Sequence, residues 1–256
     1  MNKENQARII ELVKQAKPLI LQEMVHEKVT EKGAADYVTN VDVAVQNYLK
    51  EALGKEFPDI ALIAEEKENL GLNSRKSYWI LDPIDGTTNL IRDYHLSAVS
   101  LGLYENGEIT FGVVYNPFTE ELFYGAKGEG AYLNGTPIHV SDQQEFKDAV
   151  VSFGSSPYEK NRAKELFPVF YNIFMNCADF RRTGSAALDL CYVACGRQHA
   201  YLEQNLKPWD YSGATVILRE AGGTITDWEN KEPPYLENSD ILACLPQFRD
   251  ILQRLI

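Results

Sequence analysis

The chain has 256 residues, of which 45% are hydrophobic and 24% are charged, which matches the average of globular proteins and excludes a disordered or fibrous chain. A protein of this length buries about 73% of the surface that it exposes when unfolded, so a large core forms without disulfides or a structural metal. The sequence carries 25 Lys and Arg against 37 Asp and Glu, a formal net charge of −12, and this excess of acids predicts no nucleic-acid polymer and no membrane as a partner.

The first half of the chain predicts two helices followed by strands. Apolar residues recur at helical spacing as far as about residue 27, and Pro18 should kink or split this first helix. Thr39 opens a second helix as its N-cap, with Asp42 three residues further on. Short apolar runs then predict strands, and the Asn106-Gly107 pair is typical of a tight hairpin turn. These strands are expected at residues 60–64, 78–81, 98–104, 109–115, 122–124 and 130–133.

From about residue 150, helices and strands alternate. Helices are expected at residues 159–175, 185–195, 209–221 and from 246 onward, and strands at residues 149–153, 200–203 and 241–245. The Gly222-Gly223 pair ends the third of these helices. We expect two sub-domains, residues 1–145 and 146–256, which share a long interface in a layered architecture of mixed α/β class.

Cysteine usage and the N-terminus predict a cytoplasmic protein. The polar sequence MNKENQARII lacks the apolar segment of a secretory signal, and no apolar run approaches the roughly 18 residues that span a membrane. The four cysteines form no C-x-x-C pair. Cys191 and Cys195 are four positions apart and allow half of a zinc site, but buried and reduced thiols are the better interpretation.

The most informative segment is DPIDGTTN, residues 82–89. A predicted strand ends in Asp82, Gly86 permits a tight turn, and the residues after it open a turn or a helix with free backbone N–H groups. Two carboxylates, the carbonyl of Ile84 and several amides thus fall within one turn, an arrangement that suits a hard cation beside an anion such as phosphate. An acidic turn with capping roles alone explains the same residues equally well.

Further acids stand at the end of one predicted strand and at the start of one predicted helix. Glu65 and Glu66 follow the strand at residues 60–64, and adjacent acids at a strand end point in opposite directions, so one can face a site. Asp210 lies at a helix start, where an acid caps the helix. Taken alone, these acids are more typical of a solvated pair and a cap. The D-x-D-G-T signature of haloacid-dehalogenase-like phosphatases is excluded, because the acids here are three positions apart rather than two.

Together these segments resemble, in order and spacing, the inositol monophosphatase family of lithium-sensitive, magnesium-dependent phosphatases. The resemblance covers most of the chain, and DPIDGTTN is its most specific motif. Two departures, Ala64 where Gly is common and Leu90 where Phe is common, remove no metal ligand. Supporting matches are residues 36–39 (DYVT) with Asp42, residues 128–132 (GEGAY) with Asn134-Gly135, and residues 184–187 (GSAA).

The resemblance implies a metal site and a mechanism. Glu65, Asp82 and the carbonyl of Ile84 would hold a first Mg²⁺. Asp82, Asp85 and Asp210 would hold a second, and Glu65 would help a third, weaker ion. All-oxygen ligands favour Mg²⁺ over Zn²⁺.

The resemblance also implies how the substrate is attacked and held. The nucleophile would be a water on the first metal, oriented by Glu65 and by Thr87, whose hydroxyl would bond Asp42. Backbone amides of Gly86 and Thr87 would bind the phosphate. The substrate would contact Asp85, Gly184, Ser185, Ala186 and Glu203.

The family has a layered αβαβα sandwich and is usually a homodimer, so both are expected here, with a small-molecule phosphate monoester as substrate. Residues 1–145 would hold the metals and the phosphate, and residues 146–256 would complete the metal site and the substrate pocket.

Glu203 decides which substrate we expect, unless it is a solvated acid at a strand end. Its carboxylate can accept hydrogen bonds from two neighbouring hydroxyls of a polyol ring and would repel a second phosphate, which favours myo-inositol 1-phosphate. The alternatives are fructose 1,6-bisphosphate, adenosine 3′,5′-bisphosphate, a dinucleotide phosphate, or a catalytically inactive relative that binds a metal or polyol phosphate. The sequence leaves open whether the substrate contacts Lys32, His95, Arg181 or Arg182.

Overall fold

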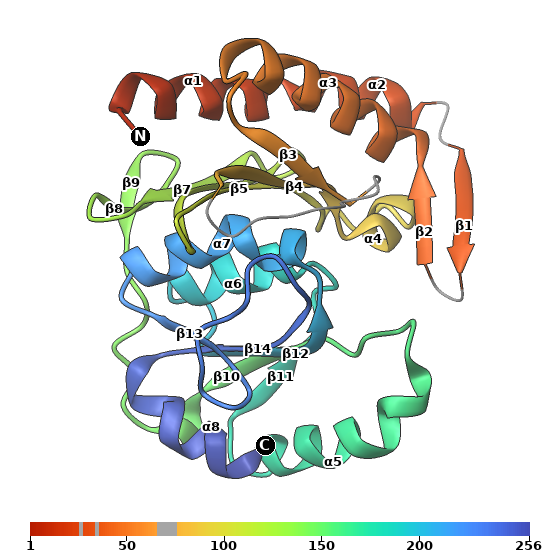
Figure 1. The fold of residues 1–256 in the computed structure, drawn as a ribbon. Helices are drawn as coiled ribbons and strands as arrows, with labels where there is room; N and C mark the ends of the chain where they lie inside the picture. The colour runs from red at the N-terminus through yellow and green to blue at the C-terminus, as the bar shows by residue number, and fades with distance from the viewer. Residues whose placement is uncertain (26–27, 34–35, 66–75) are drawn as a thin grey trace.

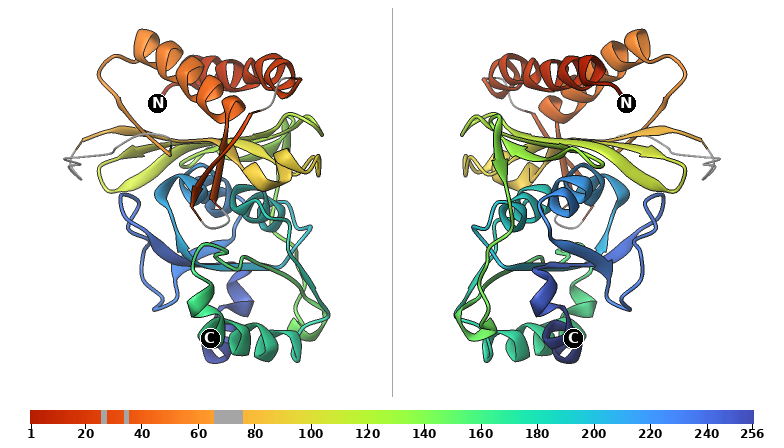
Figure 2. Two further views of the ribbon diagram at one scale, coloured as in Figure 1. Left: turned by 90° about the vertical axis from the view of Figure 1, so that its right-hand side faces the viewer. Right: turned by 90° about the vertical axis from the view of Figure 1, so that its left-hand side faces the viewer.

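The computed structural model describes residues 1–25, 28–33, 36–65 and 76–256. It stacks five layers in the order helix, sheet, helix, sheet, helix (Figure 1), and the two side views show the same order (Figure 2). The expected αβαβα sandwich of mixed α/β class is therefore confirmed. Within the described residues, no helix combines the length and apolar character that crossing a bilayer requires.

The elements of the five layers are as follows. The first layer holds α1 (Lys3–Lys14), α2 (Ala16–Met24) and α3 (Asn40–Glu56). The first sheet contains, in spatial order, β3 (Ala61–Ala64), β4 (Tyr78–Asp85), β5 (Ala98–Glu105), β6 (Glu108–Asn116), β7 (Glu121–Ala126), β8 (Gly130–Leu133) and β9 (Thr136–Ile138). The central layer holds α6 (Ala186–Ala194) and α7 (Pro208–Glu220). The second sheet has the order β11 (Asp179–Arg181), β10 (Val150–Phe153), β12 (Ala200–Leu206), β14 (Ser239–Cys244) and β13 (Thr224–Asp227), and the last layer holds α5 (Ala163–Phe174) and α8 (Arg249–Leu255).

Smaller elements complete the fold. A two-stranded hairpin, β1 (Val29–Gly33) and β2 (Asp36–Thr39), stands beside the short helix α4 (Thr87–Ile91) (Figure 1). In the described part of the chain, short 3-10 helices span Phe146–Asp148, Lys160–Arg162 and Pro246–Phe248. The second of these replaces the first turn of the helix that was expected to start at residue 159.

Local sequence signals account for several element boundaries. The first helix is split at Gln15, as expected, because Pro18 has no N–H to donate to the carbonyl of residue 14. The second segment ends at Met24, and residue 27 lies outside the described residues. Thr39 forms the expected capping box, in which the Asp42 carboxylate accepts the Thr39 N–H at 2.8 Å.

Strand β4 is buried along its whole length because layers cover both faces of its sheet. Trp79 and Leu81 point into the core beneath the N-terminal helices. Tyr78 and Ile80 point the other way, into the core that continues through the central helices and the second sheet. The buried strand carries Asp82 and Asp85 to its C-terminal end, at the edge of the layers.

Three glycines in neighbouring strands seat α7 directly on the first sheet. Gly112 lies opposite both Gly102 and Gly125 in the strand register, so the three form a row across β5, β6 and β7. A Cβ atom at Gly112 would lie 2.0 Å from the carbonyl oxygen of Gly213 in α7. The glycine row therefore sets the depth of α7, whose first turn carries Asp210.

Candidate active site

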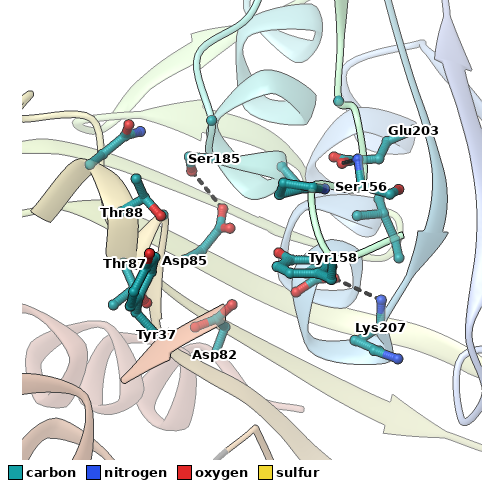
Figure 3. Close-up of a pocket in the computed structure, with 18 of the residues that line it drawn as sticks. Tyr37, Asp82, Asp85, Thr87, Thr88, Ser156, Tyr158, Ser185, Glu203 and Lys207 are labelled. Atoms are coloured by element: carbon teal, nitrogen blue, oxygen red, sulfur yellow. Dashed lines mark hydrogen bonds between the residues drawn. The ribbon is translucent and has the colours of Figure 1, made fainter. Parts of the chain in front are cut away.

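A cavity of about 900 Å³ opens where the end of β4 and α4 face β12 and the start of α7 (Figure 3). Its walls come from both halves of the chain. Among the residues assigned from the sequence, Asp42 alone does not line it. The others that do are Glu65, Asp82, Ile84, Asp85, Gly86, Thr87, Gly184, Ser185, Ala186, Glu203 and Asp210.

Three carboxylates form a compact cluster in this cavity. Asp82, Asp85 and Asp210 each offer an oxygen within 4.8 Å of the others. Glu65 lines the same cavity and pairs with the Nζ of Lys32 at 3.1 Å. Three acids gathered so closely are suited to hold a divalent cation through oxygen ligands alone.

Hydrogen bonds fix one oxygen of each carboxylate. The Oδ1 of Asp82 accepts from the backbone N–H of Ile84 at 3.0 Å. The Oδ2 of Asp210 accepts from the N–H of Lys207 at 2.7 Å, which also caps α7. The Oδ2 of Asp85 accepts from a hydroxyl and an amide of the segment that starts α6. The cluster is thus oriented by the surrounding backbone.

Burial and mutual repulsion raise the pKa values of these acids. Burial raises the pKa of Asp82 well above its ordinary value, and the charges of Glu65 and Asp85 raise it further. Burial, with the charge of Asp85, likewise raises the pKa of Asp210. Burial raises the pKa of Asp85 to about 6, against the lowering effect of the hydrogen bond from Ser185. A bound cation would relieve the repulsion and return all these groups to the charged form.

Thr87 and Asp42 form the contact that the family resemblance implied. The Thr87 hydroxyl lies 3.0 Å from Oδ1 of Asp42 and 3.1 Å from the carbonyl oxygen of Ile84. The other oxygen of Asp42 accepts from the hydroxyl and the N–H of Thr39 at 2.6 and 2.8 Å. The capping box of α3 therefore holds in place the carboxylate that accepts the hydrogen bond from Thr87.

The turn after β4 requires glycine. Gly86 has a φ of +90°, and a Cβ atom there would lie 2.9 Å from the carbonyl oxygen of Leu96. Asn89 then ties the turn to the second half of the chain, because its Nδ2 donates to Leu96 at 2.7 Å and to the carbonyl of Thr183 at 2.8 Å. This role of Asn89, the last residue of the DPIDGTTN motif, was not predicted from the sequence.

The segment from Gly184 to Ala186 faces Asp85. Gly184 has a φ of +87°, and the buried Ser185 caps α6 by accepting from the N–H of Leu188 at 3.3 Å. The Ser185 hydroxyl also donates to Oδ2 of Asp85 at 2.5 Å. Ser185 therefore orients an acid of the cluster, a contact that the sequence did not predict.

The basic residues left open by the sequence fall into two groups. Lys32 and Arg182 line the cavity, whereas Arg181 and His95 are absent from its walls. Arg181 bonds Asp179 on the surface, and the ring of His95 stacks on Phe118 with 5.1 Å between ring centroids. Glu66, the second acid of the pair after β3, lies outside the described residues. The cavity is also lined by Ser156, Tyr158, Asp189 and Lys207, which belong to no recognisable sequence motif and were not predicted.

A layered αβαβα fold with clustered carboxylates beside a helix start is suited to the chemistry of a metal-dependent phosphatase. The chain belongs to the inositol monophosphatase family, whose model matches residues 1–255. The resemblance seen in the sequence is thereby confirmed. Members of this family hydrolyse phosphate esters of small molecules with the help of metal ions.

Individual relatives support the same placement. Nus factor SuhB of Pasteurella multocida is 38% identical over 88% of this chain and 85% of its own. The structure of inositol monophosphatase from Anabaena (Nostoc) sp. superposes with a TM-score of 0.88 at 32% identity, covering 99% of this chain and 95% of that one. An IMPase/NADP phosphatase complexed with Mg²⁺ and phosphate superposes with a TM-score of 0.90 at 25% identity, with coverage of 99% and 95%.

Proposed function

We propose that this protein hydrolyses myo-inositol 1-phosphate to inositol and phosphate, with Mg²⁺ in the acid cluster. The observation that carries the proposal is the juxtaposition of the cluster, Glu65 and the Thr87–Asp42 pair in one cavity. The cavity also contains Glu203, an acid placed on the side opposite Thr87 (Figure 3).

The residues fit divalent ions that take oxygen ligands. Glu65, Asp82 and the carbonyl of Ile84 would hold one Mg²⁺, and Asp82, Asp85 and Asp210 would hold another, with Glu65 helping a third. The raised pKa values of the buried acids fit this use, because a cation supplies the positive charge that the cluster lacks. When bound, the ions neutralise the charge of the phosphate and lower the pKa of water.

Thr87 orients the attacking water. When its proton lies on the bond to Asp42, the Thr87 oxygen can only accept a hydrogen bond, so a water beside it donates one proton there. Glu65 accepts a hydrogen bond from the other proton of the water. With both protons directed in this way, a lone pair of the water faces the phosphorus. Amides of Gly86 and Thr87 at the start of α4 hold the phosphate oxygens.

The leaving group lies toward the second half of the chain. Asp85, Gly184, Ser185 and Ala186 line that side, and the Glu203 carboxylate accepts hydrogen bonds from two neighbouring ring hydroxyls. The same carboxylate repels a second phosphate, which disfavours fructose 1,6-bisphosphate, adenosine 3′,5′-bisphosphate and dinucleotide phosphates.

A substrate panel tests the proposal. Purified protein is assayed for phosphate release from inositol 1-phosphate, fructose 1,6-bisphosphate, adenosine 3′,5′-bisphosphate and NADP, with Mg²⁺ and with EDTA, and Asp82→Asn is the inactive control. We expect inositol 1-phosphate to have the highest kcat/KM and EDTA to abolish all turnover. A tenfold preference for any other substrate overturns the assignment, and turnover in EDTA overturns the metal chemistry.

The partners and location of the protein are part of the same proposal. We infer a cytoplasmic homodimer without a nucleic-acid partner, in keeping with the net charge of −12. The name of the Pasteurella relative, Nus factor SuhB, favours a second candidate, a Nus-factor role outside catalysis. Expression of Asp82→Asn in cells that lack the gene separates the two roles. A defect of the deletion strain that this inactive variant corrects belongs to the second role. Light scattering measures the oligomer.

A further inference from the structure

We propose that Tyr201 is a positioning residue which, with the loop at residues 154–156, fixes the Glu203 carboxylate in the orientation that selects polyol substrates. The inference rests on the proposed function, because it concerns how the leaving group is recognised. It assigns a role to side chains that lie behind the cavity wall and do not take part in the metal chemistry.

The Glu203 carboxylate is held at both oxygens. Its Oε2 accepts from the Tyr201 hydroxyl at 2.6 Å, and its Oε1 accepts from the backbone N–H of Ser156 at 3.2 Å. Tyr201 and Glu203 are two positions apart in β12, so their side chains share one face of the strand. Tyr201 is 1% exposed, and its hydroxyl approaches the carboxylate from within the protein. Each oxygen keeps the capacity to accept one more hydrogen bond from the cavity.

A glycine allows the carboxylate to lie against the neighbouring backbone. A Cβ atom at Gly154 would lie 1.8 Å from both Cδ and Oε2 of Glu203. The N–H of Gly154 donates to the carbonyl of Leu202 at 3.0 Å, which fixes this backbone beside β12. The carboxylate is therefore limited by a wall on one side and by two donors at its oxygens.

The backbone near Glu203 is strained at one position. Ser156 has a φ of +41°, a value that residues other than glycine rarely adopt, while Asn205 has a φ of +56°, which asparagine adopts more readily. The pairing of β12 with β14 is irregular between Glu203 and Leu206. Hydrogen bonds maintain this shape, since the Ser156 hydroxyl donates to the carbonyl of Gln204 at 2.5 Å and the Asn205 N–H donates to Asp240 at 2.7 Å. Such strain is typical of sites where a side chain must be aimed.

A fixed carboxylate matters because two neighbouring hydroxyls must meet its two oxygens at once. Without the Tyr201 hydroxyl, Oε2 loses its inner donor and the carboxylate rotates. A rotated carboxylate still satisfies one substrate hydroxyl but not the pair, so polyol substrates lose affinity. An aryl phosphate has no such hydroxyls, and its turnover depends only on the metal site.

Three variants and a matched control test the proposal: Tyr201→Phe, Gly154→Ala, Glu203→Gln and Tyr235→Phe. Tyr235 is also buried, and its hydroxyl donates to Glu232 at 2.6 Å, but it lies outside the cavity walls, so its variant removes the same kind of bond elsewhere. For each protein, kcat and KM are measured with inositol 1-phosphate and with p-nitrophenyl phosphate in Mg²⁺, and circular dichroism checks the fold.

We expect Tyr201→Phe to raise KM for inositol 1-phosphate about tenfold, the worth of one hydrogen bond to a charged group, with p-nitrophenyl phosphate within twofold of wild type. Gly154→Ala should also raise KM for inositol 1-phosphate. Tyr235→Phe should change the kinetic constants of neither substrate. If Glu203→Gln loses selectivity while Tyr201→Phe behaves like Tyr235→Phe, positioning by Tyr201 is refuted and the proposed function stands. If wild type prefers inositol 1-phosphate and Glu203→Gln keeps that preference, the recognition role of Glu203 and this inference fail together. If wild type hydrolyses only the aryl phosphate, the proposed substrate itself is wrong.

Discussion

Replacing Gly112 by alanine tests whether the glycine row positions a metal ligand at a distance. The new methyl group would lie 2.0 Å from the carbonyl oxygen of Gly213, whereas ordinary contact begins at 3.4 Å. Helix α7 must therefore move away from the sheet by more than 1 Å at this point. Asp210 lies one turn earlier on the same helix, so it moves with it.

A movement of this size exceeds what a magnesium site tolerates. Mg²⁺ holds its ligands at about 2.0–2.1 Å in a strict octahedron. A displacement of about 1 Å in a positioned group costs about a hundredfold in rate, and the overpacked core loses about 1–3 kcal/mol of stability. We expect Gly112→Ala to need at least about tenfold more Mg²⁺ for half-maximal activity and to have kcat/KM about a hundredfold lower.

Two other glycines provide graded controls in Mg²⁺ titrations of activity and of melting temperature. A Cβ atom at Gly125 would lie 3.2 Å from Cα of Ile217, which requires a shift of only a few tenths of an ångström, so Gly125→Ala should show a smaller effect. A Cβ atom at Gly54, inside α3, meets nothing within 4 Å, so Gly54→Ala should stabilise the fold by about 0.5–1 kcal/mol and leave the Mg²⁺ response unchanged. A folded Gly112→Ala protein with the wild-type Mg²⁺ midpoint would refute the reasoning.

Three further predictions concern the acids and Thr87. Mg²⁺ at 100 times its dissociation constant should stabilise the wild type by about 2.7 kcal/mol in thermal melts, and Asp82→Asn should lose this response and all turnover. In EDTA the variant should melt higher than wild type, because it has no buried carboxylate that must either stay charged or take up a proton. An Asp82→Asn protein that still responds to Mg²⁺ contradicts this. In steady-state kinetics, Thr87→Ala should lower kcat about 10²- to 10⁴-fold with little change in KM. Asp42→Asn should also lower kcat, because it changes the acceptor of the Thr87 hydrogen bond. An effect on KM alone would exclude a role of Thr87 in aligning the water. Burial raises the pKa of Asp189 to about 7, so the folded state prefers the protonated acid. The contribution of Asp189 to the stability of wild type should therefore fall by up to about 4 kcal/mol as pH rises from about 4 to 7. In urea unfolding, Asp189→Asn should therefore gain stability relative to wild type between pH 5 and pH 8, and a relative loss would reverse the assigned sign.

Sequence patterns predicted the parts of the fold that depend on neighbouring residues. The Asn106-Gly107 turn has the two positive φ values, +53° and +96°, that its sequence favours, and the hairpin of β5 and β6 follows from it. The capping box at Thr39 depends only on a residue three positions later. Short strands of mixed composition, such as β11 and β13, carried no comparable signal and were not predicted.

Contacts between distant segments could not be predicted in the same way. Asp210 lies near Asp82 because α7 packs directly on the glycine row of the first sheet. The periodicity of a strand does not show which helix will cover that strand. The order of the five layers came from the family resemblance alone. The fixed position of the Glu203 carboxylate likewise depends on Gly154, a loop residue. Its role becomes visible only when β10 and β12 lie side by side.

The central layer also determines how the chain can fold while it is being synthesised. The first sheet ends at Ile138, but α6 and α7, which cover its lower face, are complete only at Glu220, about 80 residues later. At a synthesis rate of about 5–20 residues per second, the apolar face of that sheet stays uncovered for roughly 4–16 s before both helices have been made. Asp210 lies in the first turn of α7, so the acid cluster is assembled only as this helix covers the sheet. Phosphatase activity would thus be absent from incomplete chains, and a nascent chain that stalls before residue 208 would present an aggregation-prone sheet rather than a partly active enzyme.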